Sequence, residues 1–323
     1  MLITVIRRGI AAAALAVMAT AAQAQAWPSR PVRLVVGFTP GGGVDINARM
    51  LAGKLTEILG RTVVVENRPG AGTNIANEFV AKSAPDGHTL LINTAALAIN
   101  MSLYKNVPFD TLRDFAPASV FSESQNILLV NAAKPYKSAA EVVAAARARP
   151  GALSFSSAGS GSTQHLAGEL FKLQTRTEIL HVPYKGSAPS LTALIAGDVD
   201  LIFINVPAVL PHIKSGRLRP LAAAGARRSD LLPDVPTLKE AGINGVEVSV
   251  WYGVLAPAGT PREIVATLAA AITRAARSPD IRQKLIEQGA EPVGNSPEEF
   301  AALLRDEVAR WREVVRVAGI RLE

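Results

Sequence analysis

Short apolar runs rich in β-branched residues alternate along the chain with segments in which apolar residues return every three or four positions. Residues 33–36, 62–66 and 88–93 have the pattern of buried strands. The segment after the first of these runs places Leu51 and Leu55 on one face of a helix. This alternation predicts an α/β fold of parallel sheets covered by helices on both faces.

Three helix starts carry the signature of a capping box, in which a Ser or Thr and a Glu three residues later bond to each other's backbone N–H. Two of them add a proline, which suits the first position of a helix. The boxes are Ser138 with Glu141, Thr260-Pro261 with Glu263, and Ser296-Pro297 with Glu299. The helix after the last box repeats apolar residues at helical spacing, and we interpret that stripe as core packing.

The first 26 residues have the pattern of an export signal. Arg7 and Arg8 form a basic start, residues 10–22 are all apolar or small, and Ala24-Gln25-Ala26 fits a small-x-small cleavage site. The apolar run is shorter than the ~20 residues that a membrane-spanning helix needs. We predict a signal peptide at residues 1–26, cleavage near Ala26 and a periplasmic protein. A buried core helix is the competing interpretation.

Two apolar segments, 120–130 and 246–256, have the pattern of strands that pass between two domains. If both cross, a first lobe comprises residues 27–123 plus 250–323. Residues 124–249 then form a second, inserted lobe. Two crossings permit bending at a hinge and place a cleft between the lobes.

Composition narrows the function classes. The 323-residue chain has no cysteine, which excludes disulfides, thiolate nucleophiles and Cys-ligated metals. Its four histidines are widely spaced and form no HExxH motif, so we predict no metal and no cofactor. Aromatic residues are only 5% and no Lys/Arg block accompanies the net charge of +7, which argues against nucleic-acid binding.

A glycine-rich loop, Phe38-Thr39-Pro40-Gly41-Gly42-Gly43-Val44-Asp45, follows the first predicted strand and opens a helix. Backbone N–H groups and the helix dipole favour an anion at such a place. The loop has neither the GxxxxGK[ST] pattern of a phosphate-binding loop nor the GxGxxG pattern of a dinucleotide site, so a carboxylate is the predicted anion. The alternative is a turn that only needs flexible glycine.

A second loop, residues 156–165, has the sequence Ser-Ser-Ala-Gly-Ser-Gly-Ser-Thr-Gln-His and also lies between a strand and a helix. Its hydroxyl and N–H groups are suited to grip a second carboxylate from the opposite lobe. The alternative is a hydrolase in which Ser160 or Ser162 acts with His165. No GxSxG elbow is present, however, and serines at a helix start serve as caps.

Two more strand ends carry polar groups. Residues 181–189 run from a strand into a helix start, with Ser187 as the predicted cap and Lys185 as a positive charge near the cleft. Asn205 ends another predicted strand with an amide suited to face a ligand. We interpret His165 and His181 as structural rather than as metal ligands. None of these features pairs two carboxylates for acid–base catalysis, so the sequence describes a binding protein.

Several short motifs follow one another along nearly the whole chain after residue 26. They are Pro31-Val32-Arg33 before the glycine-rich loop, Val65-Glu66-Asn67-Arg68-Pro69-Gly70-Ala71-Gly72, Ala84-Pro85-Asp86-Gly87-His88-Thr89-Leu90-Leu91, His181-Val182-Pro183-Tyr184-Lys185-Gly186, Leu210-Pro211-His212-Ile213-Lys214-Ser215-Gly216 and Ala256-Pro257-Ala258-Gly259-Thr260-Pro261. In this order they resemble the Bug receptors, the extracytoplasmic solute-binding proteins of tripartite tricarboxylate transporters.

The resemblance implies a two-lobed periplasmic-binding-protein fold of type II. Each lobe would be a mainly parallel sheet flanked by helices, and the cleft would close on a small carboxylate. By the same resemblance, the ligand lies against Phe38, Gly41, Gly42, Asp45 and Thr94 of the first lobe and Gly159, Gly161, Ser162, Thr163 and His165 of the second. Asp45 is expected to cap its helix or to hold waters. Many relatives have an aspartate at the position of Ile204, and its loss here argues against an amino-acid ligand.

Three functions are compatible with these patterns. The leading one is a monomeric periplasmic receptor that captures a mono-, di- or tricarboxylate and delivers it to the membrane permease of a tripartite tricarboxylate transporter. The second is a carboxylate sensor that signals to a membrane kinase. The third and least favoured is an exported serine hydrolase, so we do not expect an enzyme.

Overall fold

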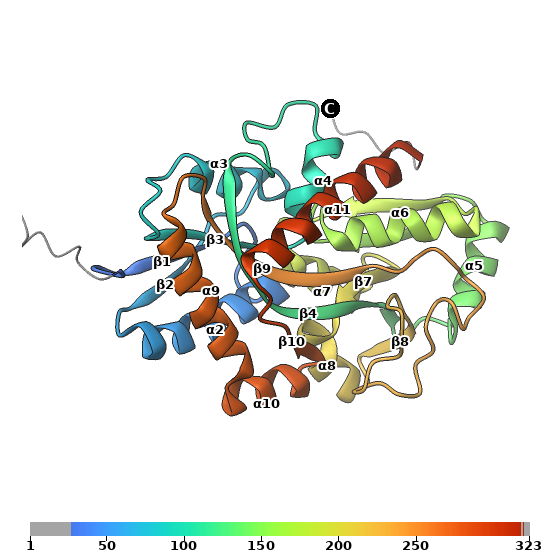
Figure 1. Cartoon of the computed structure of the whole chain (residues 1–323). Helices are drawn as coiled ribbons and strands as arrows, with labels where there is room; N and C mark the ends of the chain where they lie inside the picture. Colours follow the sequence, from blue (N-terminus) through green and yellow to red (C-terminus); the bar gives the residue numbers. More distant parts are fainter. Residues whose placement is uncertain (1–26, 318, 320–323) are drawn as a thin grey trace, which may run out of the picture.

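A computed structural model describes residues 27–317 and residue 319, so the predicted signal peptide lies outside the described residues (Figure 1). The strands are β1 (Val32–Val36), β2 (Val63–Asn67), β3 (Thr89–Asn93), β4 (Phe115–Asn131), β5 (Leu153–Ser157), β6 (Ile179–Pro183), β7 (Leu201–Asn205), β8 (Leu218–Ala223), β9 (Ser249–Pro257) and β10 (Ala290–Pro292). The helices are α2 (Gly43–Leu59), α3 (Asn74–Ala81), α4 (Ala96–Leu103), α5 (Ala139–Ala148), α6 (Thr163–Thr175), α7 (Ser187–Ala196), α8 (Val206–Lys214), α9 (Arg262–Arg277), α10 (Pro279–Glu287) and α11 (Pro297–Val317), and a short 3-10 turn, η1, spans Ala71–Thr73.

The strand–helix alternation predicted for the first hundred residues is confirmed. Strands β1, β2 and β3 begin and end within one residue of the predicted runs. Leu51 and Leu55 of α2 are fully buried, as the helical spacing required. Helices cover both faces of the sheet, because Leu34 of β1 packs in one apolar cluster with α2 and α9, whereas Val35 points into the other with α4 and α11.

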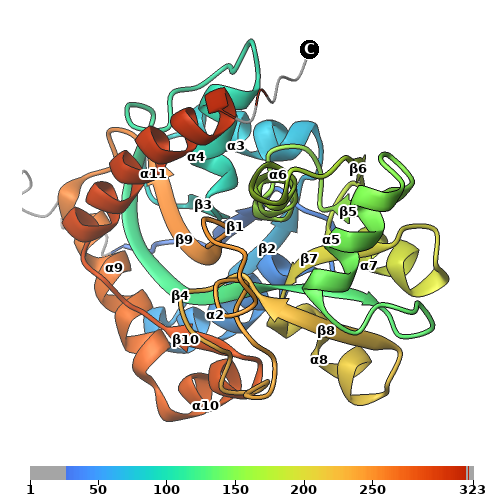
Figure 2. The same cartoon turned by 90° about the vertical axis from the view of Figure 1, so that its right-hand side faces the viewer.

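The strands form one continuous sheet in the order β2–β1–β3–β9–β4–β7–β5–β6, and β8 and β10 both pair with β4. The strand–helix–strand parts are parallel, whereas the long strands β4 and β9 run antiparallel to their neighbours. Strand β4 pairs with β9 as far as Gln125 and with β7 from Asn126 onwards. Figure 2 shows β4 running across the molecule, with α9, α10 and α11 on one side and α5, α7 and α8 on the other.

Two of the three predicted capping boxes are confirmed. At Ser138 and at Ser296, the Oγ atom accepts the N–H of the glutamate three residues later at 3.2 Å. The third prediction is wrong: the hydroxyl of Thr260 donates to the carbonyl oxygen of Pro257 at 2.7 Å, and α9 begins at Arg262. The Thr260 hydroxyl is therefore bonded within the preceding turn and does not cap the helix. The apolar stripe of α11 is core, as predicted: Phe300, Leu304 and Trp311 are nearly inaccessible, and Leu303 packs against the same cluster while partly buried.

Candidate functional site

Four helices begin around one small cavity between the two halves of the sheet. Helices α2, α6 and α7 start at Gly43, Thr163 and Ser187, and Asn205 precedes the first residue of α8. The full lining is Phe38, Gly43, Val44, Thr94, Ala158, Ser162, Thr163, Gln164, Ser187, Asn205, Val250 and Tyr252. Within the described residues, no Lys, Arg, Asp or Glu contributes to it. First-turn N–H groups have no partner within their helix and carry the positive end of its dipole, so the cavity favours an anion.

The cavity is narrow. Its interior is about 20 Å³, which is room for about one water molecule. A wider outer cavity of about 240 Å³ shares Phe38 and Ala158 with it and is lined further by Tyr104, Tyr184 and Lys185. Lys185 therefore lies at the outer cavity, as a charge near the cleft, and does not line the inner one.

The glycine-rich loop of the first half is held by a buried carboxylate. Oδ2 of Asp45 accepts the N–H of Gly41 at 3.0 Å and Nε of Arg49 at 2.9 Å, and Oδ1 accepts from Nδ2 of Asn67 at 2.9 Å. Burial alone would raise the pKa of Asp45, but these hydrogen bonds and the charge of Arg49 outweigh it and lower the pKa below its ordinary value of 3.8. Asp45 thus orders the loop from beside the cavity.

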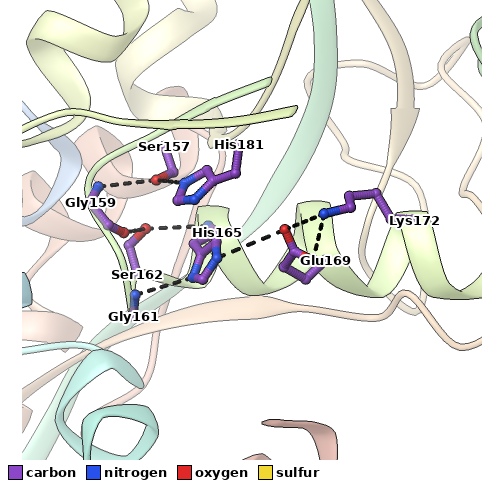
Figure 3. Close-up of polar contacts among 8 residues, drawn as sticks. All are labelled: Ser157, Gly159, Gly161, Ser162, His165, Glu169, Lys172 and His181. Atoms are coloured by element: carbon purple, nitrogen blue, oxygen red, sulfur yellow. Dashed lines mark hydrogen bonds and ion pairs between the residues drawn. The ribbon is translucent and has the colours of Figure 1, made fainter. Parts of the chain in front are cut away.

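The hydroxyl-rich loop of the second half is held by its own side chains (Figure 3). Oγ of Ser162 caps α6 by accepting the N–H of His165 at 3.3 Å, and its hydroxyl donates to the carbonyl of Gly159 at 2.7 Å. The N–H of Gly161 donates to Nδ1 of His165 at 3.2 Å, and that of Gly159 donates to Oγ of Ser157 at 3.1 Å. Ser162 therefore acts as a helix cap, and its hydroxyl is not bonded to an imidazole.

Beneath this loop, two histidine rings stack on each other. The ring centroids of His165 and His181 are 4.0 Å apart with a 21° angle between planes, and Nε2 of His181 is 2.7 Å from Oγ of Ser157 (Figure 3). Burial lowers the pKa of His165 to about 2 and that of His181 to about 4, with Lys172 adding to both shifts. Both rings are neutral at pH 7 and serve as packing and hydrogen-bond partners, which agrees with the structural role inferred from the sequence.

The predicted site residues gather in one place, but only some face the cavity. Those in its lining are Phe38, Thr94, Ser162, Thr163 and Asn205. The others, Gly41, Gly42, Asp45, Gly159, Gly161 and His165, belong to the same two loops but are not in this lining, and Gly159 lines the outer cavity. In the first loop Gly43 and Val44 line the cavity, whereas Gly41 and Gly42 do not. The N–H groups of Gly41, Gly159 and Gly161 are already bonded within their loops.

Sequence reasoning missed several lining residues. Gln164 lies between two predicted residues and went unnoticed, although it follows the first residue of α6. Tyr252 is the one phenol in an apolar strand, and its Oη accepts from Nδ2 of Asn205 at 2.7 Å. Ser187 was expected to cap α7, but Gly186 occupies that position and Oγ of Ser187 accepts from Nε2 of Gln164 at 2.8 Å. These contacts join segments that are distant in the sequence, so no local sequence pattern predicts them.

The inference drawn from Ile204 assumed a side chain beside the ligand, and the structure does not place it there. Ile204 is fully buried in an apolar cluster with Ile127 and Leu129, away from the lining of the cavity. Successive side chains of a strand point to opposite faces, so Asn205 faces the cavity and Ile204 does not.

The described residues contain neither a metal-binding cluster nor a membrane-spanning helix. No three His, Asp or Glu side chains of residues 27–317 gather closely enough to hold a metal ion. No helix in the same range combines the length and the apolar character that crossing a membrane requires.

A two-lobed α/β fold with an anion-favouring cavity at the junction of its lobes defines a solute-binding receptor. Residues 47–320 match the tripartite tricarboxylate transporter family receptor, TctC, and the chain belongs to this family. BugT of Bordetella pertussis is 40% identical over 312 residues, which cover 96% of each chain. The predicted resemblance to the Bug receptors is therefore confirmed.

Solved structures of related receptors have the same fold. Rpa4515 of R. palustris, determined with adipate, is 42% identical with a TM-score of 0.89 over 92% of this chain and 100% of that chain. MatC of Rhodopseudomonas palustris, determined with bound malate, is 33% identical with a TM-score of 0.86 over 90% and 100%. The family is one of binding receptors and not of enzymes, which removes the hydrolase alternative.

Proposed function

We propose that this receptor captures a small carboxylate between its lobes and delivers it to the permease of a tripartite tricarboxylate transporter. The observation that carries the proposal is the meeting of four helix N-termini in a cavity whose described lining has no charged side chain. Such a cavity stabilises a carboxylate through backbone N–H groups and hydroxyls. Adipate and malate, present in the structures of two relatives, are both dicarboxylates.

Closure of the cleft is the proposed mechanism. With lobes at residues 27–123 plus 250–323 and at 124–249, β4 would cross between them near Gln125, where its partner strand changes from β9 to β7. An interior of about 20 Å³ is too small for a dicarboxylate. We infer that the lobes separate to admit the ligand and then close on it, so that binding shifts the population toward the closed form.

Glycines allow the two lobes to approach closely. A Cβ atom at Gly43 would overlap Nδ2 of Asn205 in the opposite lobe. The same holds for Gly161 against Asn100 and for Gly186 against Thr39. These positions support closure, because a Cβ at any of the three would hold the lobes apart.

Export belongs to the same proposal. The receptor would work in the periplasm as a monomer after cleavage near Ala26. Its family membership supports an extracytoplasmic receptor. N-terminal sequencing of the protein recovered from a periplasmic extract would establish the cleavage site.

The test is thermal unfolding of residues 27–323 against mono-, di- and tricarboxylates, each paired with its amide. A ligand present at 100 times its Kd adds about 2.7 kcal/mol to the free energy of unfolding and raises Tm by a few degrees. We expect at least one carboxylate to raise Tm and its amide to have no effect. The absence of any carboxylate that outperforms its amide would refute the proposal.

A further inference from the structure

Among the described residues, one side chain of the cavity lining, Gln164, has a buried polar atom without a hydrogen-bond partner. Gln164 is 4% exposed, and its Nε2 donates to Oγ of Ser187 at 2.8 Å. Its Oε1 is buried and meets no donor among the described residues. Buried polar atoms in proteins nearly always find a partner, so an unpaired atom in a cavity wall points to a bound molecule.

Two hydroxyl groups of the cavity lining, those of Tyr252 and Ser187, can supply donors. Burial raises the pKa of Tyr252, so the phenol keeps its proton, and its Oη already accepts from Asn205. Oγ of Ser187 likewise accepts from Gln164. The hydroxyl hydrogens of Tyr252 and Ser187, with the first-turn N–H groups of the helices, are therefore suited to a carboxylate. Oε1 of Gln164 differs from all of these because an amide oxygen can only accept.

A ligand that satisfies this wall needs a carboxylate and also a donor of its own. An ammonium group would be such a donor, but it would call for a negative partner, and no Asp or Glu of the described residues lines the cavity. The carboxylate of Asp45 in the adjoining loop is already engaged by Arg49 and Asn67. A hydroxyl group needs no counter-charge and fits the neutral amide oxygen.

We propose that Oε1 of Gln164 accepts a hydrogen bond from a hydroxyl group of the ligand, carried close to the carboxylate that the helix N-termini hold. The favoured ligand class is a small hydroxycarboxylate, and Gln164 is the residue that distinguishes it from the plain acid. This inference rests on the proposed carboxylate function and narrows it. A site built to bond a hydroxyl discriminates against the analogue that lacks it, because the buried acceptor is then left unpaired.

The experiment is isothermal titration of residues 27–323 with malate, succinate and aspartate, which differ only in a hydroxyl, a hydrogen or an ammonium group on one carbon. The pair 3-hydroxybutyrate and butyrate extends it to monocarboxylates. We expect the hydroxy acid of a pair to bind at least about tenfold more tightly than the plain acid, and aspartate to bind no better than succinate. In Gln164→Met the ratio of the affinities for the hydroxy acid and the plain acid should fall to about one. The control is Gln174→Met, an exposed glutamine near the end of the same helix, which keeps the preference.

Several outcomes would overturn the inference while leaving the carboxylate function intact. They are equal affinity of the unaltered protein for hydroxy and plain acids, tighter binding of aspartate than of malate, and a preference that survives Gln164→Met. An equal loss of malate and succinate binding in Gln164→Met would also overturn it, because the amide would then be donating to the carboxylate. Failure of every acid in both sets to bind would overturn the carboxylate function itself.

Discussion

Two loops open onto the candidate cavity, and opposite chemistry holds them in place. The glycine-rich loop is fixed by the ionised carboxylate of Asp45, which accepts the N–H of Gly41 and pairs with Arg49. The hydroxyl-rich loop is fixed by a neutral imidazole, since Nδ1 of His165 accepts the N–H of Gly161. Each loop uses a glycine N–H for its own order and leaves the first turn of the following helix to the ligand.

The difference shows where the attraction for an anion originates. A carboxylate beside the cavity would repel an anionic ligand, but Arg49 neutralises it. The second loop avoids the problem by using stacked, uncharged rings. Neither loop presents a basic side chain to the cavity, so the helix N-termini supply the positive potential.

Lowering the pH should separate the contributions of the two loops to the free energy of unfolding more than any other change. Above pH 6.5, His165 and His181 are neutral in both the folded and the unfolded chain and add no pH dependence. Between pH 6.5 and about 4, the unfolded chain binds protons that the buried rings resist, so the free energy of unfolding falls. The loss from His181 alone should reach about 3 kcal/mol at pH 4. Because the pKa of Asp45 is lowered, its contribution is lost only as pH falls below 3.8.

Urea unfolding at several pH values from 7.5 to 4 measures this effect. In His181→Gln the slope of stability against pH should be clearly shallower over this range, because an amide does not titrate. His212→Gln, on the partly exposed end of α8, should leave most of the slope unchanged. A stability curve that stays flat down to pH 4.5, or an equally steep one in His181→Gln, would show that the ring pair is not held neutral.

Removing the anchor of the first loop should have the next largest effect. Asp45→Ala leaves the N–H of Gly41 and the amide of Asn67 without their acceptor, and we expect a loss of about 2–3 kcal/mol at pH 7 by urea unfolding. The matched control is Asp230→Ala, which removes an exposed ion pair to Arg227 and should change stability little. Equal effects of the two substitutions would mean that Asp45 does not order the loop.

The sequence alone could predict those parts of the site that are formed by residues close to one another along the chain. A strand, a run of small residues and a helix start lie within a few positions of one another at Gly41 and again at Ser162, and their physical meaning does not depend on the rest of the chain. Asn205 was found in the same way, at the end of a strand. Ser162 and Asn205 line one cavity, and Gly41 lies in the loop that enters its lining at Gly43.

The contacts that join distant segments could not be predicted this way. Tyr252 meets Asn205 and Ser187 meets Gln164 only because the strand order places β9 and α7 beside the two loops. The capping prediction failed at Thr260 for a local reason, because the preceding turn binds the same hydroxyl. The inference from Ile204 assumed a side chain beside the ligand, but a one-residue step along a strand turns the side chain to the opposite face.

The measurement that tests the central claim most directly is the affinity of Gly43→Ala for the best carboxylate, measured by isothermal titration beside Gly53→Ala. Both substitutions lie in α2, and a Cβ at Gly53 meets nothing within 4 Å. One at Gly43 overlaps Asn205 across the cleft and also lies 2.8 Å from Oη of Tyr252 in its own lobe. If both lobes grip the ligand at once, Gly43→Ala should bind at least about tenfold more weakly with its fold retained, and Gly53→Ala should bind as the unaltered protein does. Unchanged affinity in Gly43→Ala would contradict the claim that the carboxylate is held between closing lobes.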